Sequence, residues 1–483
     1  MQGRGWGQLV NGAVSANGTP AWLRSPAFLA WAAAAVLLAA LHYAHDIRNY
    51  SYDAGEYWLM ATVPGEVWQG RWIRGYLLPL LLGSLLDLGS LFGVGAGDAF
   101  RLFSAAAYAA VLTQLLPATL HRLAGTPLGL ARRLAPAVLL ALVFPGALLY
   151  PLSDVPALAF MWLCVYCLLR CRDEAAGNGA VAGWALAAGA AAGAAYNIRS
   201  IYLFSVVLVL LVMLLQFKNR RHAAAWAIAG FVLVGLPQLA INQSRHGLAS
   251  INPAAAMGER SLFIQQLTAG LSVQRYETSI APEVPPAVVY ADPAGRALLA
   301  KICEAGSIES IADYAAAVAR HPIAFAGLYA RHFINMLDVR DAYLYIQQPS
   351  SGKTLRSIAC ITLFLAMLLA IGSAWRAGTV QGQRADWAYP LAFVLPTLAQ
   401  VPGAVETRYA IPLYVLLFAA SAACWSWPVM AAELRSRWAA CLGAAIAGLA
   451  LFFMVTQNTM AAPDKDFTGT GAHGCASLNI PKT

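Results

Sequence analysis

An acidic segment at residues 51–57 contains two carboxylates, Asp53 and Glu56, that need a chemical explanation. They lie just past the first apolar run of a chain in which only 23 of 483 residues are Asp or Glu. A charged side chain at the edge of a bilayer is costly unless it pairs or faces water. A carboxylate within hydrogen-bond reach of a hydroxyl can take its proton while that hydroxyl attacks. We therefore take Asp53 as the candidate general base, and Glu56 as its helper or as the base itself.

Two arginines, Arg199 and Arg408, stand at the ends of later apolar runs and suit a phosphate group. A guanidinium combines positive charge with a planar fork of donors, which matches phosphate oxygens. These two residues are therefore the candidates for binding the phosphate of a donor. Polar residues in the same segments complete the set of candidate substrate-binding residues, which are Glu406, Asp154, Asn197, Tyr57 and Tyr409.

The elements that position these residues are membrane helices. Hydrophobic residues make up 59% of the chain and charged residues 11%, and the mean hydropathy is +0.59. These values are typical of an all-α integral membrane protein, because backbone groups in hydrocarbon must be paired internally. Apolar stretches of roughly 17 to 25 residues predict about eleven spans, at residues 27–44, 100–120, 134–150, 154–171, 180–197, 200–217, 224–242, 356–375, 387–404, 409–427 and 438–457.

Residues 75–92 are also apolar, but Gly83, Ser84, Asp87 and Ser90 recur at helical spacing and form a narrow polar stripe. If this segment crossed the membrane, the basic clusters of the downstream loops would lie outside, against the positive-inside rule. We therefore predict a juxtamembrane helix along the outer surface. The amino end then lies in the cytoplasm, and the carboxyl end and all the candidate site residues lie on the outer, periplasmic side.

The predicted topology divides the chain into four parts. They are an amino-terminal membrane module at 1–243, which includes the first outer loop at 45–99, an outer loop region at 244–355, four further spans at 356–457 and a tail at 458–483.

The outer loop region is too long for a simple connector. Its Pro-rich part, 281–286, is predicted to be irregular, whereas 294–304 and 308–337 have helical periodicity and few breakers. Arg331 and His332 lie on an amphipathic stretch and are interpreted as part of a solvated face. The prediction is a small helical domain over an outer cavity.

Charge and motifs exclude several classes of function. The basic residues sit in small clusters at span ends, so the net charge of +9 follows from topology and does not indicate nucleic-acid binding. The cytoplasmic loops contain no phosphate loop and no dinucleotide fingerprint. Chemistry on the outer face therefore needs an activated donor delivered in the membrane, for which a lipid-linked phosphosugar is the obvious type.

The eight cysteines form no convincing metal set. Cys164, Cys167 and Cys171 share one helical face, but no histidine or carboxylate accompanies them, so we interpret them as small buried hydrophobes. Cys303 and Cys475 both map to the outer side, where a disulfide is chemically feasible.

These features together resemble the GT-C superfamily of integral membrane glycosyltransferases. The similar motifs are the acidic segment after the first span, a juxtamembrane helix before the second and a Tyr-Pro-Leu-Ser-Asp turn at 150–154. Residues 406–412 in a late span and the Ala-Arg-His-Pro sequence at 319–322 of the outer loop are similar too. The order of the motifs and their common sidedness carry the resemblance, which covers nearly the whole chain as topology.

The resemblance implies a GT-C-like helical bundle that transfers a sugar from a polyprenyl-phosphate carrier, with inversion, on the periplasmic face. Its acceptor would be lipopolysaccharide or O-antigen, another lipid-linked glycan or a protein. The Ala-rich, Arg-over-Lys composition suggests a GC-rich bacterial genome, and the expected location is the bacterial inner membrane. Asp53 takes the place of the catalytic base. Many relatives have adjacent acids in this loop, whereas Asp53 and Glu56 are three apart, so either residue remains a candidate. Metal dependence varies in the superfamily, which leaves a divalent metal open.

Structural roles stand beside the functional ones. Asp53 could cap a helix that begins at Ala54, with a Glu three residues later in a capping-box-like arrangement. The two arginines could anchor to lipid headgroups, Glu406 could only pair with Arg408, and Asp154 could cap the fourth span. Two other functions also stay open: a periplasmic glycan polymerase or ligase that uses a diphosphate-linked donor, and a flippase or transporter of lipid-linked sugars.

Overall fold

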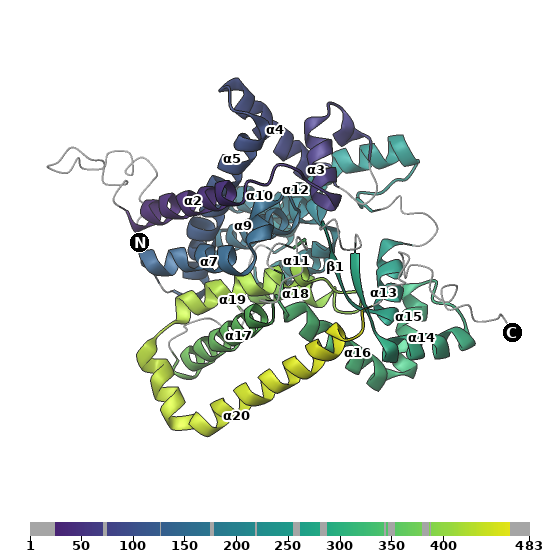
Figure 1. Ribbon diagram of the computed structural model, residues 1–483. Helices are drawn as coiled ribbons and strands as arrows, with labels where there is room; N and C mark the ends of the chain where they lie inside the picture. The colour runs from purple at the N-terminus through teal and green to yellow at the C-terminus, as the bar shows by residue number, and fades with distance from the viewer. Residues whose placement is uncertain are drawn as a thin grey trace.

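The protein is described here by a computed structural model, which covers residues 25–70, 75–125, 127–173, 178–217, 220–254, 261–280, 287–341, 344–345, 353–378, 386 and 388–463. These residues are mostly helical and include one two-stranded sheet. Figure 1 shows a bundle of long helices, with the shorter helices α13 to α16 gathered on one side of it.

Eight helices among the described residues are long and apolar enough to cross a membrane, so the chain is a multi-pass helical membrane protein. They are α2 (Pro26–His45), the continuous helix of α5 (Ala96–Ala110), η3 (Val111–Leu115) and α6 (Leu116–Ala124), then α9 (Asp154–Asp173), α10 (Asn178–Ile198), α12 (Arg220–His246), α17 (Lys353–Arg376), η6 (Thr407–Ala410) with α19 (Ile411–Cys424), and α20 (Trp427–Met460). Each of them coincides with a predicted span.

The other three predicted spans form shorter helices. They are α7 (Leu130–Val143) with α8 (Pro145–Leu149), η4 (Ser200–Tyr202) with α11 (Leu203–Gln216), and α18 (Ala388–Leu398). The break between α7 and α8 falls at Phe144, whose backbone is non-helical (φ −130°, ψ 56°). Its cause is local, because a residue that precedes a proline is disfavoured in the helical region.

The first outer loop contains α3 (Tyr52–Thr62), η2 (Glu66–Trp68) and α4 (Leu77–Leu91). The last of these is the segment predicted to be juxtamembrane. Its 15 residues make it about 22 Å long at about 1.5 Å per residue. This length is short of the roughly 30 Å hydrocarbon core of a bilayer.

The outer loop region folds around its own small core. Its elements are α13 (Leu262–Ser272), β1 (Val273–Thr278), β2 (Ala287–Ala291), α14 (Pro293–Ala305), α15 (Ile311–Arg320) and α16 (Pro322–Leu337). The core includes Leu267, Leu271, Leu299, Phe325 and Leu328. Both stretches with helical periodicity are helical, the second being broken at His321 before a proline. The antiparallel β1–β2 hairpin was not predicted, and the Pro-rich part, 281–286, lies outside the described residues.

The interpretation of His332 as part of a solvated face is wrong. His332 is fully buried, and its Nδ1 hydrogen-bonds the Val401 carbonyl oxygen at 2.7 Å. The reason is that α16 packs against β1 and η6, so this side of the helix has no contact with water. Arg331 keeps 29% of its side chain exposed and pairs with Asp292 at 2.7 Å.

The cysteines are largely as predicted. Cys164, Cys167 and Cys171 are buried free thiols in α9. Cys303 of α14 is disulfide-bonded. Cys475 lies outside the described residues.

Helices α10 and α12 cross closely because glycines leave room at the contact. A Cβ added at Gly189 of α10 would lie 1.8 Å from the Ala227 carbonyl oxygen, and one at Gly230 of α12 would lie 2.1 Å from that of Leu186. Small residues at helix contacts let backbones approach in this way inside membranes. This crossing holds the carboxyl end of α10, where Arg199 follows.

The crossing can be tested with Gly189→Ala. We expect the unfolding midpoint of the detergent-purified protein to fall by several degrees, because separating two packed backbones costs on the order of 1–3 kcal/mol. The matched control is Gly183→Ala on the same helix, where an added Cβ meets nothing within 4 Å. Equal midpoints for the two variants would contradict the packing described here.

Candidate active site

The Arg408 guanidinium is shared between two acids. Its Nη2 lies 2.8 Å from an Asp53 carboxylate oxygen, and its Nε lies 2.6 Å from Glu406 Oε2. Arg408 is 11% exposed and Glu406 only 1%, whereas Asp53 keeps 29% of its side chain accessible. Asp53 is therefore the member of this group that a ligand can reach.

A second arginine lies close to this group. Arg199 pairs with Asp154, a carboxylate that is 3% exposed. The guanidinium carbons of Arg199 and Arg408 lie 5.3 and 5.8 Å from the centre of the Tyr409 ring, so one ring is close to both cations. Cation–π contacts of this kind favour a guanidinium near an aromatic ring. The ends of α10 and the start of α19 thus bring the two predicted phosphate ligands together.

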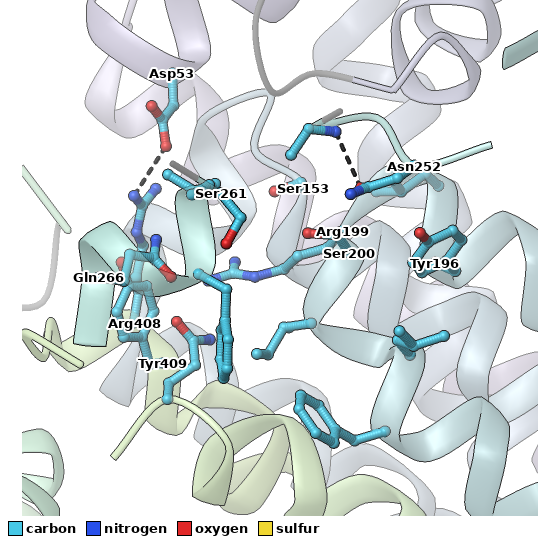
Figure 2. Close-up of a pocket in the computed structure, with 18 of the residues that line it drawn as sticks. Asp53, Ser153, Tyr196, Arg199, Ser200, Asn252, Ser261, Gln266, Arg408 and Tyr409 are labelled. Carbon is cyan, nitrogen blue, oxygen red and sulfur yellow. Dashed lines mark hydrogen bonds and ion pairs between the residues drawn. The ribbon is translucent and has the colours of Figure 1, made fainter. Parts of the chain in front are cut away.

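A cavity of about 390 Å³ opens beside the two arginines. Figure 2 shows Asp53 and Arg408 on one side of it, Arg199 in its middle, and Asn252 with Tyr196 on the far side. Its volume is at the low end of the roughly 300–1,000 Å³ typical of small-molecule sites. The predicted site residues that line it are Asp53, Tyr57, Arg199, Arg408 and Tyr409.

The remaining predicted residues lie around the cavity. Asp154 and Glu406 stand behind the arginines as their counter-ions. Asn197 is buried, and its side chain accepts from the backbone N–H of Leu77 at 3.0 Å and donates to Gln238 at 3.1 Å. Its amide thus holds the start of α4. Glu56 is half-buried on α3 and is not among the lining residues.

Helix α3 presents Asp53 from its first turn. The N-cap residue is Ser51, so the alternative in which Asp53 itself caps the helix is wrong by two positions. An acid in the first turn is stabilised by the positive end of the helix dipole. Tyr52 has a left-handed backbone (φ 50°), and its hydroxyl donates to the Ser279 carbonyl oxygen at 2.9 Å. A strained residue next to the cavity wall is typical of functional sites.

Strand β1 holds the segment that carries Glu406 and Arg408. The backbone N–H of Tyr276 donates to the Val405 carbonyl oxygen at 3.0 Å. Thr407 bonds both Glu277, at 2.6 Å, and Arg275, at 2.8 Å. These three contacts fix the backbone on both sides of Glu406.

The sequence analysis did not predict the buried charged residues that support this segment. Arg275, Glu277 and Asp338 are buried and paired with one another, with Arg275 2.6 Å from Glu277 and 3.3 Å from Asp338. The available signal was the alternation of Arg275, Tyr276 and Glu277, which is typical of a strand.

Neutral polar residues form the rest of the cavity and were also missed. They come from five separate segments and include Ser153, Ser200, Asn252, Ser261, Gln266 and Gln400. No property of a lone Ser or Gln distinguishes a cavity position from an exposed loop.

Burial raises the pKa of Glu406 to about 7, although the adjacent Arg408 lowers it. The Oε2 atom of Glu406 accepts from Arg408, whereas Oε1 is buried without a hydrogen-bond partner in the described part of the chain. A buried carboxylate oxygen without a partner is costly when the group is ionised. Glu406 therefore exchanges its proton near neutral pH.

Within the described residues, no group of three or more His, Cys, Asp or Glu side chains is arranged to hold a metal ion. Comparisons with known protein families, with curated proteins and with solved structures found no match.

The buried state of Glu406 predicts a pH-dependent stability. Its pKa in the folded protein is above the ordinary value of 4.5, so the stabilisation of the protonated form is complete below about pH 4.5 and is lost as the pH rises through about 7. Glu406→Gln, which keeps an acceptor for Arg408, should therefore gain in unfolding midpoint relative to the natural protein between pH 5 and pH 8. A midpoint difference that stays constant over this range would show that Glu406 does not titrate there.

Proposed function

We propose that the protein is a membrane glycosyltransferase of the GT-C type, which moves a sugar from a polyprenyl-phosphate carrier to an acceptor hydroxyl of a glycan, lipid or protein. The observation that carries this proposal is the 2.8 Å contact between Asp53 and Arg408 at the wall of the cavity. One ligand that enters the cavity meets a carboxylate and a guanidinium together. A base for the acceptor and a cation for the donor phosphate are the two groups that the transfer needs.

The proposed reaction is a single displacement. The acceptor oxygen attacks the anomeric carbon, the bond from that carbon to the phosphate oxygen breaks, and polyprenyl phosphate leaves with the electron pair. Asp53 takes the proton of the attacking hydroxyl. Arg408 and Arg199 neutralise the charge that develops on the leaving phosphate. Attack opposite the leaving group inverts the anomeric carbon.

The charges of the site favour a monophosphate donor over a diphosphate donor. Two arginines face three acids, Asp53, Asp154 and Glu406, so the formal sum is 2 − 3 = −1 with all of them ionised. A sugar phosphodiester adds one negative charge, whereas a diphosphate adds two. Protonation of Glu406 offsets only one negative charge. The site charge therefore supports a polyprenyl-phosphate-sugar donor over the diphosphate-linked donor that a polymerase or ligase would use.

The contacts also support the proposed topology. Asp53 follows α2, Asp154 begins α9, Arg199 follows α10 and Arg408 precedes α19, yet all four lie in one cluster. The chain between Asp53 and Asp154 must then cross the membrane an even number of times. The continuous α5–α6 helix and the α7–α8 pair, which together cover 130–149, would supply two crossings, which favours an interfacial position for α4.

The disulfide at Cys303 supports an extracytoplasmic position for the outer loop region. Disulfides persist in oxidising compartments such as the periplasm and are rare in the cytosol. Strand β1 of the same region hydrogen-bonds the segment next to Glu406. The candidate site would then face the periplasm of a bacterial inner membrane.

The proposed base is tested by Asp53→Asn. We expect sugar transfer from synthetic glucosyl-phosphoryl-polyprenol to a set of alkyl glycosides to fall on the order of 100-fold or more, because the proton acceptor is lost. Product is measured by mass spectrometry with the full-length protein in detergent. The controls are Glu56→Gln, which tests the neighbouring acid as the base, and Asp87→Asn, an exposed position on α4.

Three results would contradict the proposal. Turnover near the natural rate in the Asp53→Asn protein would remove Asp53 as the base. Turnover only with a diphosphate-linked donor would indicate the polymerase or ligase. In reconstituted liposomes, movement of the lipid-linked sugar across the bilayer without covalent product would indicate a transporter.

Donor binding by the same variant should change in the opposite direction. Asp53 competes with a phosphate for the Arg408 guanidinium, so Asp53→Asn should bind sugar-free polyprenyl phosphate more tightly, by about fivefold for an ion pair worth about 1 kcal/mol. Arg408→Gln should bind it more weakly. The measurement is an equilibrium titration in detergent, and weaker binding by Asp53→Asn would show that Asp53 does not compete with the phosphate.

A further inference from the structure

Most of the polar groups that line the cavity are uncharged. Of the described residues that line it, the charged ones are Asp53, Arg199 and Arg408, and each lies in the ion pairs described above. The neutral polar lining residues come from several elements. Ser153 precedes α9, Ser200 begins η4, Gln266 lies on α13 and Gln400 follows α18. Four elements thus bring uncharged hydrogen-bonding groups to one space.

These neutral side chains have donors and acceptors that are not used in hydrogen bonds within the described part of the protein. Within the part of the chain that the structure describes, the side chains of Ser153, Ser200, Gln266 and Gln400 have no hydrogen-bond partner, and the two serines and Gln400 are half-buried. Asn252 accepts from the backbone N–H of Ala254 at 3.1 Å through Oδ1, which leaves its NH₂ group for another acceptor. Serine hydroxyls and amides each offer both donors and acceptors.

We infer that the sugar taken by this cavity is an uncharged, hydroxyl-rich one, such as a neutral hexose, rather than an amino sugar or a uronic acid. The inference rests on the proposed function and specifies its donor. Each hydroxyl of a neutral sugar can both donate and accept, which matches Ser and Gln side chains. Beside Asn252 and Tyr196, an ammonium or a carboxylate would meet no opposite charge among the described lining residues, and a desolvated charge without a partner is costly.

The position of the neutral groups assigns them to the donor sugar. Ser200 follows Arg199 directly in the chain, and Gln400 also lines a second, small cavity of about 10 Å³ together with Arg199 and Arg408. A sugar bonded to a phosphate at the two arginines is therefore adjacent to Ser200 and Gln400. Figure 2 shows Asn252 on the other side of the cavity from Asp53 and Arg408, where it would meet the end of the sugar distant from the phosphate.

The experiment compares binding of four synthetic ligands to the full-length protein in detergent. They are sugar-free polyprenyl phosphate and the same lipid carrying glucose, glucuronic acid or glucosamine. The neutral donor should bind at least tenfold more tightly than sugar-free lipid, and both charged donors should bind on the order of 100-fold more weakly than the neutral one. Binding is read without an acceptor, so the result does not depend on turnover.

The variant Asn252→Asp should shift the binding preference toward the positively charged glucosamine donor. This variant keeps the acceptor for the Ala254 N–H and adds one negative charge at position 252, on the side of the cavity away from Asp53 and Arg408. It should therefore bind the glucosamine donor at least tenfold more tightly than the natural protein does. The control is Asn49→Asp, which adds the same charge at an exposed position outside the cavity lining. An unchanged preference in Asn252→Asp, or the same change in Asn49→Asp, would overturn the inference.

The outcomes separate this inference from the proposed function. Equal or tighter binding of either charged donor, or no gain from glucose over sugar-free lipid, overturns the neutral-sugar assignment while phosphate binding persists. Failure of all four ligands to bind, sugar-free polyprenyl phosphate included, instead overturns the proposed function.

Discussion

The shared guanidinium of Arg408 is the constraint on which the arrangement of the site depends. A cation that is 11% exposed is tolerated only where acids and hydrogen bonds compensate for the water that it loses. Asp53 arrives from the first outer loop and Glu406 from the segment just before α19. The start of α3 must therefore lie against the start of α19, and these two distant parts of the chain are joined through one charge.

The β1–β2 hairpin is the main support for that charge. Arg275 is itself 2% exposed and bonded to Glu277, Asp338 and Thr407, so removing any partner would leave a buried charge incompletely compensated. Because Thr407 lies between Glu406 and Arg408, the position of the hairpin decides where both side chains stand. The small outer domain thus belongs to the site, and it also contributes Ser261, Leu262, Phe263, Gln266 and Ile311 to the cavity lining.

In the proposed enzyme, two kinds of residue have separate roles. The charged groups at the helix ends hold the phosphate and move the proton, in a poorly hydrated place where electrostatic interactions are strong. The neutral groups of the cavity lining can match hydroxyls without adding charge. Mutations could therefore alter the rate of sugar transfer and the sugar specificity of the proposed enzyme independently.

Local sequence determined which stretches are helical and which residue types were candidates, because span length, apolar composition and isolated charges at span ends are properties of neighbouring residues. It did not determine the hairpin, the burial of His332, or the use of Asn197 to hold α4. It also did not show that Ser200 and Gln400 face one cavity. Tertiary structure decided these, because they depend on which helix ends meet, and that follows from packing between segments far apart in the chain.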